Sequence, residues 1–177
     1  MEEIYFKTII PSVVYGMLVW GTCLESKLTP LEKLHARAAK IVCKLGRETS
    51  SDQAILTTGW MKLSYIYKKR IATFMHDSYY KTTDPRLANL FEKDTARSTR
   101  NNKLKVIRPN IEVGRLSLRY RGPTVWNFLP NDLKTVESRE IFKNALKRHS
   151  RHINMISFTK GTTFNHNKEK DFILLLI

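Results

Sequence analysis

Cysteine is scarce in this chain, which contains only Cys23 and Cys43 among its 177 residues. With no second pair of thiols, the two cysteines cannot form a disulfide framework or a four-cysteine zinc site. This scarcity favours a reducing compartment. A signal peptide is not expected either, because Glu2 and Glu3 stand where a secretory signal carries positive charge. We therefore expect an intracellular protein, nuclear or cytoplasmic, that is not secreted.

Groups that could carry out catalysis are also few. The chain has 16 acidic residues, and they are scattered rather than paired as two-metal catalysis requires. Glu137 and Glu140 begin an expected helix, where compensation of the helix dipole explains them. His149 and His152 have helical spacing, but no carboxylate or thiol lies near them in the sequence to complete a metal site. Gly-rich phosphate loops, nucleophile elbows and HExxH motifs are absent. We expect no metal, no cofactor and no catalysis by this chain alone.

Long uncharged runs are nearly absent as well. The longest, Thr8 to Leu24, has 17 residues and is interrupted by Pro11 and Gly16. This length is near the lower limit for a membrane span, so we expect no membrane partner. The alternative interpretation is a small basic membrane-associated protein that uses residues 8–24 as an anchor. Because this apolar run starts so close to Met1, we expect the chain to be part of a longer protein.

Positive charge is abundant. The chain has 31 Lys and Arg residues against 16 Asp and Glu, a formal net charge of +15. Residues 97–151 hold 14 of these cations and four acidic residues, so their net charge is 14 minus 4, or +10. Such a surplus attracts polyanions through steering and counterion release. RNA or DNA is therefore the expected partner.

Apolar spacing predicts a mainly α-helical bundle, with helices over residues 4–20, 30–45, 50–58 and 63–80, a short helix after Asp84 and a last helix from Ser138. We divide the chain into a helical region (1–92), a basic C-terminal region (93–150) and a tail expected to be disordered (151–177).

The helix expected over residues 30–45 is bracketed by Thr29 as N-cap, Pro30 at its first position and Gly46 after its end. It has an apolar stripe and a separate cationic row. The stripe is Leu31, Leu34, Ala38, Ile41 and Leu45, and the row is Lys33, Arg37, Lys40 and Lys44. The row is interpreted as a solvated face or as a face that follows phosphates.

Near-alternation of apolar and polar residues predicts two short β-strands near residues 106–121, joined at Gly114. On such a strand Arg115, Arg119 and Arg121 share one face, which suits phosphate oxygens. The alternative is a solvent-facing edge strand protected by charge. Lys143 and Lys147 on the last helix are expected to extend the nucleic-acid-binding surface.

Gly122 and Pro123 are expected to end this strand pair. After them, Trp126, Phe128 and Leu129 are predicted to pack beneath the basic surface rather than to stack on bases.

The run RYRGPTVWNFLP (residues 119–130) resembles the C-terminal region of reverse transcriptases from non-LTR, LINE-type (jockey-like) retrotransposons. Matching positions occur elsewhere in order, over about five-sixths of the chain. They are Thr8 to Pro11, Tyr15, Gly16, Trp20, Gly21, Leu31, Leu34, Ala38, Ile41, Val42, Thr95, Arg97, Pro109, Phe142, Lys143 and Leu146.

This resemblance implies a parent protein that is an RNA-directed DNA polymerase, and a chain that corresponds to its thumb-like and C-terminal part. The family's aromatic-x-Asp-Asp polymerase motif is absent, and so are its endonuclease domain and a Cys/His knuckle after residue 150. The expectation is a non-catalytic fragment of a transposable element that binds template, primer or element RNA and is completed by a separate polymerase domain.

Overall fold

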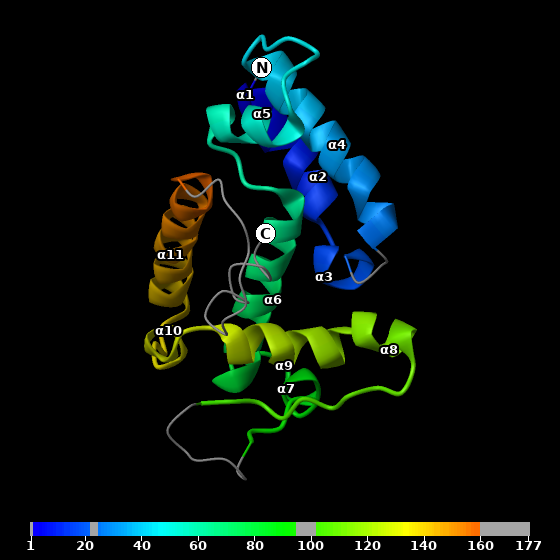
Figure 1. Ribbon diagram of the computed structural model, residues 1–177. Helices are drawn as coiled ribbons and strands as arrows, with labels where there is room; N and C mark the ends of the chain where they lie inside the picture. The colour runs from blue at the N-terminus through cyan, green and yellow to red at the C-terminus, as the bar shows by residue number, and fades with distance from the viewer. Residues whose placement is uncertain (1, 22–24, 95–101, 160–177) are drawn as a thin grey trace. The chain divides into compact units, whose positions relative to one another are not determined.

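The computed structural model describes residues 2–21, 25–94 and 102–159, with the backbone alone at 25–26 and 150–159. These residues are mainly helical, as the sequence predicts (Figure 1). The chain separates into two compact units, residues 1–70 and 71–177, and the boundary falls inside α6 (Leu63–Tyr79). The functional division at residue 92 stays a prediction.

The first unit begins with short helical segments and ends in the first half of α6. Its elements are α1 (Glu2–Ile4), the π-helix η1 (Tyr5–Ile9), α2 (Ile10–Val14), α3 (Met17–Trp20), α4 (Glu25–Val42) and α5 (Ser51–Thr58). The second unit contains the rest of α6, followed by α7 (Pro85–Ala88), α8 (Glu112–Leu116), α9 (Leu118–Phe128), α10 (Asn131–Lys134) and α11 (Arg139–Thr159).

The apolar run near the N-terminus does not form one continuous helix. Pro11 has no backbone N–H, and the turn before it widens so that the Ile10 N–H donates to the Tyr5 carbonyl, five residues back. Helix α2 then ends at Val14, and Gly16, whose φ of 62° lies in the left-handed region, precedes α3. Within the described part of the chain, no helix combines the length and apolar character that crossing a bilayer requires.

Helix α4 starts earlier and ends earlier than the sequence predicts. It begins at Glu25, so Pro30 is its sixth residue rather than its first. A proline this close to the N-terminus removes only one helical hydrogen bond. At the other end Lys44, not Gly46, adopts the left-handed conformation, with φ of 53°. The Leu45 N–H then donates to the Lys40 carbonyl (2.9 Å), which closes a Schellman-type end.

The face that α4 buries differs from its predicted apolar stripe. The core of the first unit contains Ala36 and Ala39 of α4 together with Ala54, Ile55 and Trp60. The small alanines let α4 and α5 approach closely (Figure 1). In contrast, Leu34 and Ile41 are 60% and 56% exposed. Ala38 and Leu45 of the predicted stripe are partly buried against this core. The apolar spacing therefore identified the helix correctly but only part of the face that it buries.

Helix α5 agrees with the sequence at both ends. The Ser50 side chain accepts the Gln53 N–H (3.1 Å) as N-cap, and Gly59, with φ of 68°, ends the helix. The short helix expected after Asp84 is present as α7, and Asp84 caps it, since its Oδ1 accepts the Arg86 N–H (2.8 Å).

The predicted β element at residues 106–121 is wrong. Residues 112–116 form α8 and residues 118–121 begin α9, with Ser117 extended between them. Strand-like pairing in the described residues is limited to an antiparallel bridge between Lys93 and Leu104. The alternation of residue types was overridden by tertiary packing, because α9 buries Gly122, Pro123 and Trp126. Gly122 and Pro123 therefore lie inside a helix instead of ending a strand.

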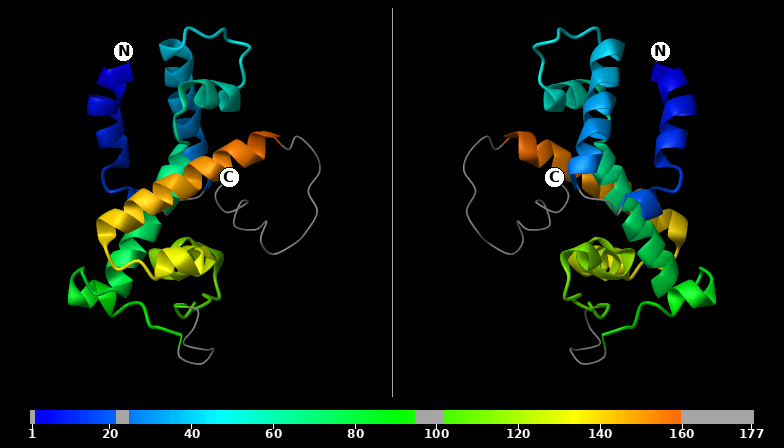
Figure 2. Two further views of the ribbon diagram at one scale, coloured as in Figure 1. Left: turned by 90° about the vertical axis from the view of Figure 1, so that its left-hand side faces the viewer. Right: turned by 90° about the vertical axis from the view of Figure 1, so that its right-hand side faces the viewer.

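The core of the second unit forms where α9 and α11 pack on the second half of α6. Trp126, Phe142 and His76 are 0% exposed, and the rings of His76 and Phe142 stack at 4.3 Å. At Gly122 an added Cβ would lie 2.6 Å from the Met75 sulfur, so α9 crosses α6 at very short range (Figure 2). Only glycine permits this approach without a shift of Met75.

The last helix expected from Ser138 is present as α11 (Arg139–Thr159). Phe142 and Leu146 of α11 are buried, but Ile141 is 57% exposed. The tail expected to be disordered starts inside α11, which continues to Thr159, and residues 160–177 lie outside the described residues.

Candidate nucleic-acid interface

Two neighbouring side chains of α9 hold the segment that precedes α8. Asn127 Oδ1 accepts the Leu104 N–H (2.8 Å), while its Nδ2 donates to the Leu104 carbonyl (2.7 Å). Trp126 Nε1 donates to the Asn102 carbonyl (2.9 Å). One side chain thus satisfies both backbone groups of Leu104, which is 2% exposed. We call residues 102–105 the clamped segment.

The opposite side of the clamped segment is held by backbone bonds. The Asp94 N–H donates to the Lys103 carbonyl (3.0 Å), and the Lys105 N–H donates to the Glu92 carbonyl (2.9 Å). The Tyr79 hydroxyl donates to Asn102 Oδ1 (3.1 Å). Because hydrogen bonds hold its backbone on both sides, the backbone of the segment has a fixed position, and its side chains start from fixed points.

Exposed lysines occupy this segment. Lys103 and Lys105 are both exposed, and Lys105 pairs with Glu92 (Nζ–Oε2 3.1 Å). Both belong to the 14 cations of residues 97–151, but neither is among the predicted nucleic-acid-binding residues. Alternation of Lys103 and Lys105 around the apolar Leu104 was the signal that could have identified them.

A buried lysine lies behind the same region. Lys134 is 1% exposed; its Nζ donates to the Asn127 carbonyl (3.0 Å), and its own carbonyl accepts the Tyr80 hydroxyl (2.6 Å). Burial lowers the pKa of Lys134 to about 8, and the charge of Lys103 acts in the same direction. Lys103 of the clamped segment therefore lies close enough to Lys134 for the two positive charges to repel each other.

Residues 109–114 fold back on themselves through a close contact. A Cβ on Gly114 would lie 2.6 Å from Pro109 Cβ, so only glycine fits without displacement. Arg108 comes directly before Pro109 in the sequence, and Arg115 comes directly after Gly114. Both arginines are exposed. Gly114 therefore serves this compact turn and not the strand junction predicted for it.

The three arginines predicted to share a strand face do not share one. Arg115 belongs to α8, whereas Arg119 and Arg121 are two residues apart on α9 and so point about 200° apart around the helix axis. Arg119 is exposed and Arg121 is only half-exposed. The geometric argument for one arginine face is thus wrong, although the role of each arginine in binding stays a prediction.

Lys143 and Lys147 lie one turn apart on α11, as expected. Lys143 donates to Glu140 (Nζ–Oε1 3.0 Å), which neutralises part of its charge and lowers the pKa of the Glu140 carboxyl. Lys147 is exposed. Of the predicted packing residues, Trp126 and Leu129 are buried, but Phe128 is 39% exposed.

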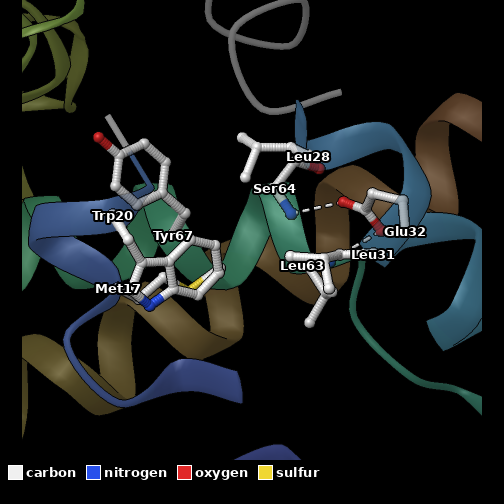
Figure 3. Close-up of a pocket in the computed structure, with 8 residues that line it drawn as sticks. All are labelled: Met17, Trp20, Leu28, Leu31, Glu32, Leu63, Ser64 and Tyr67. Atoms are coloured by element: carbon white, nitrogen blue, oxygen red, sulfur yellow. Dashed lines mark hydrogen bonds between the residues drawn. The ribbon is translucent and has the colours of Figure 1, made fainter. Parts of the chain in front are cut away.

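The first unit contains a narrow apolar hollow, shown in Figure 3. It is lined by Met17, Trp20, Leu28, Leu31, Glu32, Leu63, Ser64 and Tyr67. The Glu32 carboxylate, its one charged group, accepts the N–H groups of Leu63 (3.1 Å) and Ser64 (2.6 Å). Glu32 thereby caps the N-terminus of α6 from a distant helix, and this role is structural.

A buried histidine in the first unit also has a structural explanation. The Met61 carbonyl can only accept, so His35 Nε2 donates to it (3.0 Å) and Nδ1 accepts the Tyr5 hydroxyl (2.6 Å). Burial lowers the pKa of His35, outweighing the opposite effects of Met61 and Glu32. Tyr5 also stacks on Trp60 at 4.7 Å. The described residues contain no cluster of three or more His, Cys, Asp or Glu side chains suited to a metal ion.

Comparison of the chain with protein-family models, curated proteins and solved structures finds no match. The candidate site is therefore interpreted from its own residues. These are the exposed cations on and after the clamped segment.

Proposed function

We propose that this chain binds RNA or DNA through the exposed cations of residues 103–119, without catalysing a reaction itself. The observation that carries the proposal is the clamped segment together with the turn that follows it. The exposed cations of this stretch are Lys103, Lys105, Arg108, Arg115 and Arg119. Glu112 is the one acidic residue between positions 103 and 119. Phosphate oxygens suit this arrangement, since guanidinium groups bind them in a bidentate manner.

The proposal includes the parent protein suggested by the sequence. The resemblance to non-LTR retrotransposon reverse transcriptases supports a role in which the chain holds template, primer or element RNA. The polymerase carboxylates then belong to a separate domain. Trp126 and Asn127, the centre of the string that carries the resemblance, are used internally to hold the clamped segment. This use supports a role for the string in shaping the surface rather than in contacting bases.

A titration at increasing salt tests the proposal. The full chain should bind a fluorescein-labelled single-stranded RNA or DNA of about 20 nucleotides at low salt, because cation–phosphate contacts release counterions. Three to five such contacts should weaken the affinity about 20- to 100-fold between about 50 and about 200 mM salt. Fluorescence anisotropy measures both quantities.

Anionic vesicles serve as the comparison polyanion in the same titration. No binding of RNA or DNA at low salt, or an affinity that does not change with salt, would refute the proposal. Stronger binding to vesicles than to either nucleic acid would favour the membrane-associated alternative instead.

A further inference from the structure

The outer face of α4 combines apolar and cationic side chains with an approximate seven-residue period. Lys33 and Leu34 are followed by Arg37, and seven residues later Lys40 and Ile41 are followed by Lys44. On an α-helix, residues seven apart lie about 20° apart around the axis. Leu34 and Ile41 therefore form a straight apolar line along the helix.

This line is not used by the core of the first unit. Leu34 and Ile41 are 60% and 56% exposed, while α4 buries Ala36 and Ala39 against α5. Leaving two large aliphatic side chains in water while burying alanines costs hydrophobic stabilisation. An exposed apolar line with a helical period is the pattern of a seam for another helix.

A row of positive charge lies beside the line. Lys33 and Arg37 lie on one flank of this line, and both are exposed. Lys44 is exposed too and follows the end of α4, so it adds positive charge just beyond the helix. Residues 33–47 contain five cations (Lys33, Arg37, Lys40, Lys44 and Arg47) and no acidic residue. A partner that contacts Leu34 and Ile41 must therefore accept strong positive charge on one flank.

We propose that the outer face of α4 docks an acidic amphipathic helix of a partner protein. Leu34 and Ile41 pack into the partner's apolar seam, and Lys33, Arg37 and Lys44 pair with its flanking carboxylates. A second copy of this chain is disfavoured, because the same cationic flank would face itself. Nucleic acid leaves the two aliphatic residues without a partner. An interfacial lipid helix needs a wide apolar face, and α4 has only this narrow line outside.

The probe is a 21-residue peptide of three heptads, with Leu and Ile along its seam and Glu on both flanks. The control peptide carries Lys in place of each Glu. Isothermal titration with the full chain should detect the acidic peptide only, with an affinity that falls as salt rises. Binding of both peptides alike would overturn the proposal, because the charge would then contribute nothing.

Variants of exposed residues separate the seam from the charge. Leu34→Ser combined with Ile41→Ser should weaken peptide binding by about tenfold or more. The matched control is Leu56→Ser, an exposed leucine on α5. Arg37→Glu with Lys44→Glu should abolish binding of the acidic peptide and create binding of the Lys peptide, whereas Arg70→Glu should change neither.

The contrary results are equally definite. If the Leu34/Ile41 and Arg37/Lys44 variants bind the acidic peptide like the original chain, α4 is not the docking face. If the chain ignores the acidic peptide but loses affinity for RNA, or for vesicles of phosphatidylcholine with phosphatidylserine, in the Arg37/Lys44 variant, the face serves that other polyanion. These variants leave the cations of residues 103–119 intact, so failure here leaves the proposed function standing.

Discussion

Replacing Trp126 with alanine should lower the free energy of unfolding of the second unit by about 3–5 kcal/mol. Trp126 is 0% exposed, and its ring stacks on Tyr79 at a centroid distance of 5.0 Å. Its removal leaves a large cavity and also frees the Asn102 carbonyl, which accepts the indole N–H. Few other side chains of this unit combine so much buried area with a hydrogen bond.

Urea unfolding followed by circular dichroism measures this loss, and hydrogen exchange at the Leu104 amide reports on the clamped segment. The control is Phe128→Ala, two residues away on α9, where a 39% exposed ring predicts a loss of about 1 kcal/mol. Equal losses in the two variants would show that Trp126 is not central to the core. Unchanged protection of the Leu104 amide in Trp126→Ala would show that the clamp does not depend on the indole.

Lys134 should make the stability of the second unit rise with pH. Its folded pKa is about 8, below the usual 10.5, so the unfolded chain binds more protons between these values. The charged form is therefore penalised in the folded state below about pH 8, and the penalty is relieved as pH rises. Relative to Lys134→Met, the original chain should gain about 1–2 kcal/mol between about pH 7.5 and about pH 9.5.

Urea unfolding at several pH values gives the two profiles, and their difference isolates Lys134. The range stops below pH 10 because burial raises the pKa of Tyr79 and of Tyr80, so both ionise first in the unfolded chain and reduce stability at higher pH. Lys105→Met, at an exposed lysine, is the control and should run parallel to the original chain. Parallel profiles for Lys134→Met as well would mean that Lys134 titrates as an exposed lysine does.

Local signals in the sequence predicted what depends on local chemistry. Ser50 and Gly59 bracket α5, and Asp84 caps α7, because these caps involve residues only two or three positions away. The sequence also predicted which segments are helical, since the apolar spacing of a helix persists over several turns.

Features that depend on tertiary packing were missed. The period of α4 suggested that Leu34 and Ile41 face the core, but the close approach of α5 selects the alanine face instead. Alternation suggested strands where α9 packs on α6 through Gly122. The Asn127 clamp joins residues 23 positions apart, a distance over which no local pattern in one sequence carries information.

Counting charge in the sequence located the cations of the candidate interface. It did not show which of them lie close together in the structure. Counting identifies how much positive charge a region carries, whereas grouping requires the helix boundaries. Placing Arg119 and Arg121 on a helix instead of a strand separates them by about 200°. The contact between Pro109 and Gly114 joins positions five residues apart, which the predicted strand pair did not anticipate.

The salt dependence of RNA binding in two charge-matched variants tests the central claim most directly. One variant changes Arg108, Arg115 and Arg119 to Gln; the other changes Lys33, Arg37 and Lys44 to Gln, so each loses three exposed cations. If residues 103–119 contact phosphates, the first variant should lower the slope of log affinity against log salt by about 2, at roughly 0.7 per contact to a single strand. The second should keep the original slope. Equal slopes in the two variants would contradict the account, because RNA affinity would then depend on the total charge of the chain and not on the cations of residues 103–119.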